Sequence, residues 1–184
     1  ITNGVLSVLT TIVLDFEDGI AGTELAKAEN NVINTIEYIY NKIDSGDMIE
    51  KNLPLIFIRV RSADQFKDFS KKLSKKHCKL LTGFEFPKIN SDNALIYFEH
   101  QQYLNEKFNE ILYSMPVMED EKVAHKETRI EELKSLSDIY ADYKDMIINL
   151  GIGGTDFSSI FSLRRNIWES IYDLIEVNDC LTDI

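Results

Sequence analysis

Short segments rich in β-branched and aromatic residues alternate along the chain with longer segments in which apolar residues recur at helical spacing. This alternation is typical of repeated βα units, in which helices connect the strands of a parallel sheet. Five such units fit two α/β architectures, an open doubly wound sheet or part of an eight-unit barrel, and periodicity does not choose between them. The predicted strands cover residues 11–16, 55–60, 80–86, 111–118 and 146–152.

Helices are predicted in the segments between and after these strands. The first ends at Ser45-Gly46-Asp47, and Ser62 is a residue type that caps the N-terminus of the next. Farther along, apolar residues at positions 130, 133, 136, 139 and 140 predict one buried face of a helix. The expected helices cover residues 23–43, 62–73 and 126–145, and others begin near residues 91, 158 and 168.

The composition is that of a globular protein and predicts a single domain over residues 1–184. A net charge of −11 argues against binding to nucleic acid or to an anionic membrane. The apolar run at residues 5–14 is too short to span a membrane and lacks the features of a signal peptide. Cys78 and Cys180 are expected to be reduced thiols of a cytoplasmic protein. Because the chain begins with Ile1, we expect it to be a piece of something longer.

Every predicted strand ends in charged residues. In both architectures ligands bind at the carboxyl ends of parallel strands, so these charges are expected to converge on one site. The residues concerned, in strand order, are Asp15, Glu17 and Asp18; Arg59 and Arg61; Lys88; Glu119; and Asp156.

Two of these groups suggest specific ligands. Arg59 and Arg61 lie two residues apart on one strand face, where they would bind a carboxylate or a phosphate or, alternatively, join a salt-bridge network between strand ends. Glu119 and Asp156 suit a hard divalent cation such as Mg²⁺, although a solvated carboxylate pair or a pair neutralised by Arg59 fits the spacing equally well.

The glycines near Asp156 and the histidines give weaker indications of a functional site. Gly151, Gly153 and Gly154 match neither phosphate-binding fingerprint and are read as positions where backbone and Asp156 approach a ligand closely. The histidines lie in or beside charged helical stretches and are expected at the surface, at positions 77, 100 and 125.

The run at residues 12–20 resembles the Leu-Asp-Leu-Glu-Asp-Ala-Val signature of the citrate lyase beta subunit and HpcH/HpaI aldolase superfamily. The last matching segment, Gly-Gly-Thr-Asp-Phe-Ser, together with Leu163-Arg164-Arg165, looks closest to a bacterial branch described as C–C bond lyases of the TIM-barrel fold. The resemblance extends from about Val5 to the C-terminus. Its later segments follow in the family's order at residues 57–61, 83–88, 115–119 and 153–157.

The resemblance implies a (β/α)₈ TIM barrel, of which this chain would supply about five βα units. It implies that Glu119 and Asp156 bind Mg²⁺ or Mn²⁺ and that Arg59 contacts the carboxylate of a 2-oxo or 2-hydroxy acid. The first-strand carboxylates, Asp15, Glu17 and Asp18, would orient this arginine and the metal-bound waters. The other implied substrate-binding residues are Arg61, Lys88, Gly154 and Thr155.

Departures from the family pattern bear on substrate and assembly. Better-known members have Asn where Arg61 stands, and Glu119-Asp120 is not followed by the glycine-containing stretch of the acyl-CoA enzymes, so use of a coenzyme A thioester stays open. A full barrel needs a strand before Thr11 and at least two after Ile184. Residues outside this chain or a partner chain would supply them, and we expect a homo-oligomer.

The expected activity is cleavage or formation of a C–C bond by aldol or Claisen-type chemistry, with a small oxo acid as the substrate. Arg59, Glu17 and Asp18 are the predicted catalytic residues. Two other classes of function remain open. One is a non-catalytic interaction or regulatory module that keeps the barrel fold, and the other is a doubly wound phosphate-binding protein that uses the loop at residues 151–154.

Overall fold

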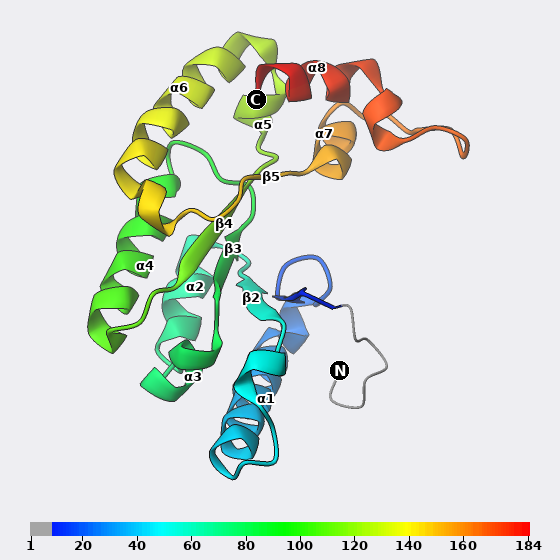
Figure 1. The fold of residues 1–184 in the computed structure, drawn as a ribbon. Helices are drawn as coiled ribbons and strands as arrows, with labels where there is room; N and C mark the ends of the chain where they lie inside the picture. Colours follow the sequence, from blue (N-terminus) through cyan, green and yellow to red (C-terminus); the bar gives the residue numbers. More distant parts are fainter. Residues whose placement is uncertain (1–8) are drawn as a thin grey trace. The chain divides into compact units, whose positions relative to one another are not determined.

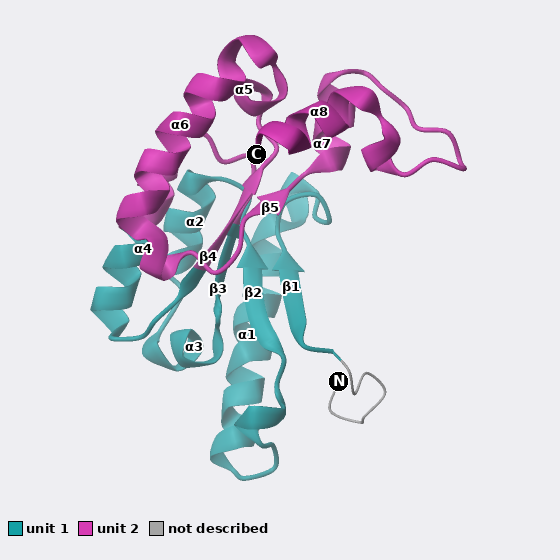
Figure 2. Ribbon diagram, turned by 45° about the horizontal axis from the view of Figure 1, so that its top comes forward, with its two compact units in different colours: residues 1–85, 100–113 teal, residues 86–99, 114–184 magenta. Residues whose placement is uncertain are grey.

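The computed structural model describes residues 9–184 as five short strands separated by helices (Figure 1). The first residues of the apolar run and of the family resemblance, positions 5–8, lie outside the described residues. The chain divides into two compact units (Figure 2). Unit 1 extends to Glu85 and includes His100–Tyr113, and unit 2 comprises Phe86–Glu99 and Ser114–Ile184.

Parallel strands form the centre of unit 1, and their ends are in register. Asp15 is paired with Arg59, and Arg59 is paired with Glu85, so one charged residue from each strand lies in the same row. These strands confirm the first two predicted segments, whereas the third begins later than predicted because Leu80 still belongs to a helix. The strands are β1 (Thr11–Asp15), β2 (Leu55–Arg59) and β3 (Gly83–Phe86).

The predicted helices of unit 1 are confirmed, and one further helix was not predicted. The first is preceded by the 3₁₀ turn η1 (Gly22–Glu24) and ends at Ser45, before Gly46 with its positive φ of 79°. The second is capped by Ser62, whose hydroxyl accepts the Gln65 amide at 3.2 Å. A 3₁₀ turn, η2 (Glu50–Asn52), precedes β2. The helices are α1 (Leu25–Asp44), α2 (Ala63–Ser70) and the additional α3 (Lys75–Leu80).

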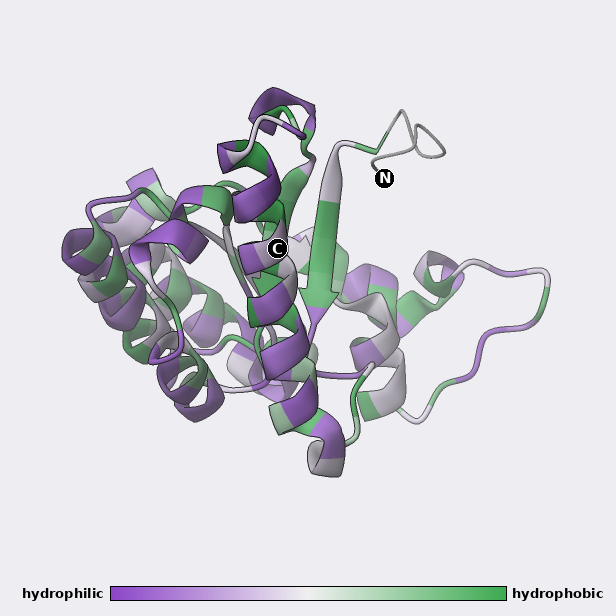
Figure 3. Cartoon of the chain, turned by 90° about the horizontal axis from the view of Figure 1, so that it is seen from below, coloured by the Kyte–Doolittle hydropathy of each residue, from purple (hydrophilic) through white to green (hydrophobic). Residues whose placement is uncertain are grey.

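Aromatic side chains fill the core of unit 1. On β2, Ile56, Phe57 and Ile58 are all buried, as expected for a parallel strand covered on both faces. Phe66 of α2 packs against Phe84 of β3 with ring centroids 4.6 Å apart. By contrast β1, which follows the grey N-terminal trace in Figure 3, is largely hydrophobic yet half-exposed, with Val13 42% exposed.

The prediction that the histidines lie at the surface is wrong for His77, which is 3% exposed. Its Nδ1 accepts the Ser74 amide at 3.1 Å and closes a capping box at the start of α3, so the ring is buried for a local structural reason. His100 is half-buried, and its Nε2 lies 2.8 Å from the Ser70 hydroxyl.

Unit 2 contains β4 (Tyr113–Met118), apart from its first residue, and β5 (Gly151–Ile152), which pair in parallel. The fourth predicted strand is therefore confirmed. The fifth is shorter than predicted, because η3 (Lys144–Met146) and an isolated bridge between Ser114 and Ile147 occupy its first part. Helix α4 (Ala94–Phe108) begins in unit 2 and confirms the helix expected after residue 91.

Several helices surround these strands in unit 2. The helix predicted at residues 126–145 is confirmed, but the residues predicted to form its buried face are only partly correct. Leu136 is buried, whereas Ile130 is 51% exposed and the charged Arg129 is 1% exposed. No helix starts near Trp168, since residues 161–170 form a loop. The helices are α5 (Glu121–Ala124), α6 (Lys126–Tyr143), α7 (Gly154–Ile160), the 3₁₀ turn η4 (Ile171–Asp173) and α8 (Ile175–Asp183).

Arg129 is buried because it joins three segments of unit 2. Its guanidinium donates to the carbonyl oxygens of Val123 at 2.8 Å and Ala124 at 2.6 Å, and forms ion pairs with Asp179 and Asp183 of α8 at 2.9 and 2.7 Å. Figure 1 shows α8 beside α5 and the start of α6. The hydrogen-bonded charge therefore attaches the C-terminal helix to the rest of unit 2.

Both cysteines are free and buried, which confirms that they form no disulfide. Among residues 9–184, none of the helices combines the length and the apolar composition that a membrane span requires.

Candidate functional site

At the end of β1 and β2, Asp15 and Arg59 form a bidentate ion pair. Arg59 Nε lies 2.8 Å from Asp15 Oδ1, and Arg59 Nη2 lies 2.6 Å from Asp15 Oδ2. The same carboxylate accepts the backbone amides of Glu17 at 2.8 Å and Gly19 at 3.1 Å, which fixes the turn after the strand. These donors, the guanidinium first, lower the pKa of Asp15 to about 2.

Two further carboxylates contact the same guanidinium at longer range. Glu17 Oε2 lies 3.3 Å from Arg59 Nη1, and Asp18 Oδ2 lies 3.2 Å from Arg59 Nη2. The hydrogen bonds to Asp15 and the charges of Glu17 and Asp18 raise the pKa of Arg59 above its ordinary value. Unit 1 thus brings together the predicted catalytic residues, and their contacts form the salt-bridge network weighed above as an alternative.

Arg61 stabilises the loop after β1 through its guanidinium. Its Nη2 donates to the carbonyl oxygens of Glu17 at 2.9 Å and Ile20 at 2.7 Å. Two charge-assisted hydrogen bonds to backbone carbonyls hold the loop that carries Glu17 and Asp18. A role of Arg61 in substrate binding stays a prediction.

Glu85 was not among the sequence-predicted site residues, yet it lies in register with Arg59 at the end of β3. Burial raises the pKa of the Glu85 carboxyl, as do the charges of Asp15 and Glu17, whereas Arg59 lowers it. Its position two residues before Pro87, at the end of a predicted strand, was the signal that could have found it. Glu85 adds a fourth carboxyl group to the surroundings of one guanidinium.

In unit 2, Glu119 follows β4 and is 4% exposed. Its Oε1 accepts the backbone amide of Lys88 at 3.1 Å, and its carboxyl group lies close enough to that of Asp156 for the two to interact electrostatically. Burial, followed by the charge of Asp156, raises the pKa of Glu119 to about 7. The two predicted metal ligands therefore lie close enough to influence each other's ionisation.

Lys88 contacts both members of this carboxylate pair. Its amide bonds to Glu119, and its Nζ lies 3.4 Å from Asp156 Oδ1. Lys88 has a positive φ of 48°, a left-handed conformation that is rare for a residue with a side chain. The side-chain amide of Asn93 donates from Nδ2 to the Lys88 carbonyl at 3.0 Å and helps to hold this conformation.

The glycine loop before α7 gives Glu119 its space. A methyl group on Gly153 would overlap the Glu119 carboxylate, so the position requires glycine for steric reasons. The Gly153 amide donates to the Met118 carbonyl at 3.3 Å, which keeps the loop close to the end of β4. The predicted substrate-binding residues that follow, Gly154 and Thr155, are buried and exposed, respectively.

The donor set of the carboxylate pair fits a hard divalent cation. Mg²⁺ prefers oxygen ligands, and one or two carboxylates together with water and substrate oxygens are sufficient to bind it. Among the described residues, no group of three or more His, Cys, Asp or Glu side chains forms a closed metal site. Glu119 and Asp156 therefore suit an open Mg²⁺ or Mn²⁺ site and do not suit a structural zinc site.

Each unit thus assembles one cluster of predicted site residues. Unit 1 joins Arg59 with Asp15, Glu17 and Asp18, and unit 2 joins Glu119 and Asp156 with Lys88. That the two clusters act on one substrate stays a prediction.

Comparisons with known proteins extend these observations. A family model described as "C-C_Bond_Lyase of the TIM-Barrel fold" matches residues 1–184. Among solved structures, the chain is similar to the lead(II) complex of malate synthase from Haloferax volcanii, with a TM-score of 0.58 and 12% identity. That similarity covers 86% of this chain and 45% of the malate synthase, so the chain spans about half of that protein's length. At this identity it shows the fold alone. No curated protein sequence matches the chain significantly.

The matching family decides between the two architectures considered at the outset. The strands and helices of residues 9–184 form an α/β fold of about five βα units, and the family places them in a partial TIM barrel rather than a doubly wound sheet. Membership in the wider citrate lyase beta subunit and HpcH/HpaI aldolase superfamily stays a prediction.

Proposed function

Because the chain belongs to the family of C–C bond lyases of the TIM-barrel fold, we propose that it takes part in Mg²⁺-dependent cleavage or formation of a C–C bond in a 2-oxo or 2-hydroxy acid. The observation that carries this proposal is the carboxylate pair formed by the buried Glu119 and the partly exposed Asp156. Two neighbouring carboxyl groups repel each other when both are ionised, and a divalent cation bound by both would relieve that repulsion.

The chain's own residues have distinct roles in this proposal. Glu119 and Asp156 hold Mg²⁺, which when bound supplies a Lewis acid for the negative charge that develops on the substrate oxygen. The Lys88 ammonium, 3.4 Å from Asp156, adds a positive charge for the substrate carboxylate. The Lys88 amide keeps Glu119 in place at the end of β4.

In unit 1, Arg59 is the residue proposed to bind a carboxylate group of the substrate. Its two short bonds to Asp15 orient the guanidinium, whereas its contacts with Glu17 and Asp18, at 3.3 and 3.2 Å, are longer and easier to exchange. A substrate carboxylate that displaced them would leave Glu17 or Asp18 free to accept a proton.

Charge-neutral variants of the metal ligands test the proposal. Glu119→Gln and Asp156→Asn each remove one anionic ligand, so calorimetric titration should show Mg²⁺ affinity reduced by about tenfold or more. Lyase activity, assayed with oxaloacetate and related oxo acids, should fall with it. Asp138→Asn is the control, because this substitution removes the same charge from an exposed position on α6.

Unchanged Mg²⁺ binding and turnover in both ligand variants would contradict the proposal. A wild-type protein that neither binds Mg²⁺ nor responds to oxo acids would instead favour a non-catalytic interaction module. In that case the network around Arg59 would serve only to join the strand ends.

A further inference from the structure

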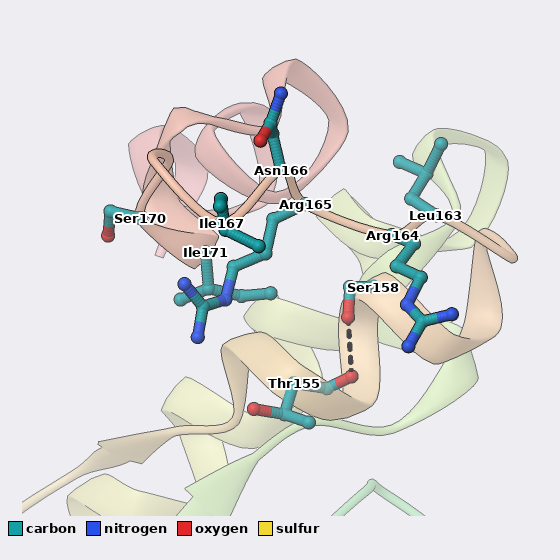
Figure 4. A pocket seen from close by; sticks show the side chains of 9 residues that line it. All are labelled: Thr155, Ser158, Leu163, Arg164, Arg165, Asn166, Ile167, Ser170 and Ile171. Carbon is teal, nitrogen blue, oxygen red and sulfur yellow. Dashed lines mark hydrogen bonds between the residues drawn. The ribbon is translucent and has the colours of Figure 1, made fainter.

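Unit 2 contains a pocket that is lined in part by Thr155. It has a volume of about 760 Å³ and lies between the first turns of α7 and the loop at residues 161–170 (Figure 4). Thr155, the residue immediately before the proposed metal ligand Asp156, lines it. The pocket is therefore adjacent in the chain to the candidate metal site and belongs to the same compact unit.

Two arginines give this pocket a positive charge. Figure 4 shows the side chains of Arg164 and Arg165 extending from the loop towards α7, on either side of the Thr155–Ser158 segment. Neither guanidinium forms an ion pair with a carboxylate in the part of the chain that the structure describes. Arg165 Nη1 donates a hydrogen bond to the Glu169 carbonyl at 2.8 Å.

By contrast, the other arginine side chains of this chain, whose net charge is −11, are engaged by protein groups. Those of Arg59 and Arg129 contact several carboxylates, and that of Arg61 donates to two backbone carbonyls. Two unpaired cations in a concave surface lower the free energy of binding an anion there.

Local hydrogen bonds fix the loop that presents the arginines. The Leu163 amide donates to the Ser158 carbonyl at 2.8 Å, the Asn166 amide to Glu169 Oε2 at 2.9 Å, and the Ser170 amide to Asp173 Oδ2 at 2.7 Å. The loop is thus tied to α7 before Arg164 and to η4 after Arg165. Binding an anion would therefore require little reordering of the backbone.

We propose that this pocket binds a phosphate group of the substrate. The proposal rests on the function proposed above and adds the substrate class, an oxo or hydroxy acid that carries a phosphate distant from its metal-binding end. Arginine binds phosphate oxygens through pairs of parallel N–H donors. Two guanidinium groups that line one pocket suit a phosphate, because the phosphate oxygens point in several directions. A carboxylate has two oxygens and is satisfied by a single guanidinium group.

The chain contains a reporter for this pocket. Trp168 is the only tryptophan, lies in the same loop and is 87% exposed. Titration of the metal-free protein with inorganic phosphate should change its fluorescence in a saturable manner, and calorimetry under the same conditions provides a second readout. Potassium chloride at matched ionic strength controls for screening, and malonate provides the carboxylate comparison.

Arg164→Ala and Arg165→Ala should each weaken phosphate binding by about tenfold, the loss expected when one charge-assisted contact is removed. Arg→Lys at the same positions should restore part of the affinity. Lys144→Ala is the matched control, since it removes an exposed cation of unit 2 that does not line the pocket. The double variant Glu119→Gln/Asp156→Asn should bind phosphate like the wild type.

Absence of saturable phosphate binding by both readouts would overturn the proposal, as would a response that chloride reproduces or arginine variants that bind like the wild type. Binding of malonate in preference to phosphate would overturn the phosphate assignment. The phosphate titration contains no metal, so a negative result would overturn the phosphate pocket alone. The proposed Mg²⁺-dependent function is tested separately by the Mg²⁺ titration.

Discussion

Asp15 is held by more hydrogen bonds than any other carboxylate of its cluster, and this makes its ionisation part of the stability of unit 1. Its pKa falls from 3.8 to about 2 on folding. Since the folded-state pKa is lowered, the ionised group stabilises the fold above about pH 4. That contribution is lost as the pH falls from about 4 to about 2.

Asp15→Asn should therefore lower the free energy of unfolding at pH 7 by about 1–2 kcal/mol, a value reduced for the partial exposure of the pair. The difference from the wild type should shrink as the pH approaches 2. Urea denaturation at several pH values measures this. Asp44→Asn, which changes an exposed carboxylate at the end of α1, is the control. A difference that does not depend on pH would contradict the assignment.

Gly153 offers a residue-scale test of the carboxylate pair without removing a carboxylate. Gly153→Ala places a methyl group where the Glu119 side chain lies, so the carboxylate must move and Mg²⁺ affinity should fall about tenfold. Gly151→Ala is the matched control, because its methyl group would meet only the Val117 side chain, at 3.2 Å. Equal affinities for both variants in calorimetric titration would show that the close approach is unimportant.

At the scale of elements, α8 depends on one buried guanidinium. Arg129→Met removes the hydrogen bonds to Val123 and Ala124 and leaves Asp179 and Asp183 without their shared partner. Asp179 and Asp183 are 33% and 38% exposed and can be solvated, so the main cost is that of leaving buried carbonyl groups without a donor. We expect a loss of about 1–3 kcal/mol in urea unfolding.

A surface ion pair to the same helix provides the comparison. Lys126 Nζ lies 2.9 Å from Asp179 Oδ1, but the lysine side chain is 70% exposed. Lys126→Met should therefore cost much less stability than Arg129→Met. If both variants lose the same stability, burial of Arg129 is not what holds α8.

The sequence predicts elements well where periodicity and turn residues agree. Helix α1 and strand β2 follow from such patterns, and Ser62 caps α2 as expected. Helix α3 could not be found this way because its six residues are too few for a periodic pattern. The buried face of α6 was misjudged at Arg129, since a sequence pattern does not reveal that distant carbonyls and carboxylates will satisfy a buried charge.

The candidate site shows the same division. Its charged residues could be predicted because strand ends are recognisable in sequence, and the charge of Asp156 acts on Glu119 as a neighbouring group would. The conformation of Lys88 and the strand register of Glu85 could not be predicted from the sequence, because both depend on how neighbouring segments are placed.

For the whole molecule, the excess of acidic groups is the dominant electrostatic feature. With a net charge of −11, repulsion among carboxylates opposes the compact state. Raising the salt concentration from about 0.01 M to about 0.15 M shortens the Debye length from about 30 Å to about 8 Å. Thermal unfolding monitored by calorimetry should therefore show a higher Tm at the higher salt concentration. A lower Tm would mean that ion pairs such as that of Arg59 outweigh the general repulsion.

The steric requirement for glycine at position 153 also predicts how this position varies among related chains. Since its lack of a side chain is required by the length of Glu119, the two positions should vary together in related chains. A larger residue at the first position would be tolerated once the acid at the second is shortened or lost. This pair of positions would then distinguish, from sequence alone, copies that retained the carboxylate pair from copies that drifted after losing it.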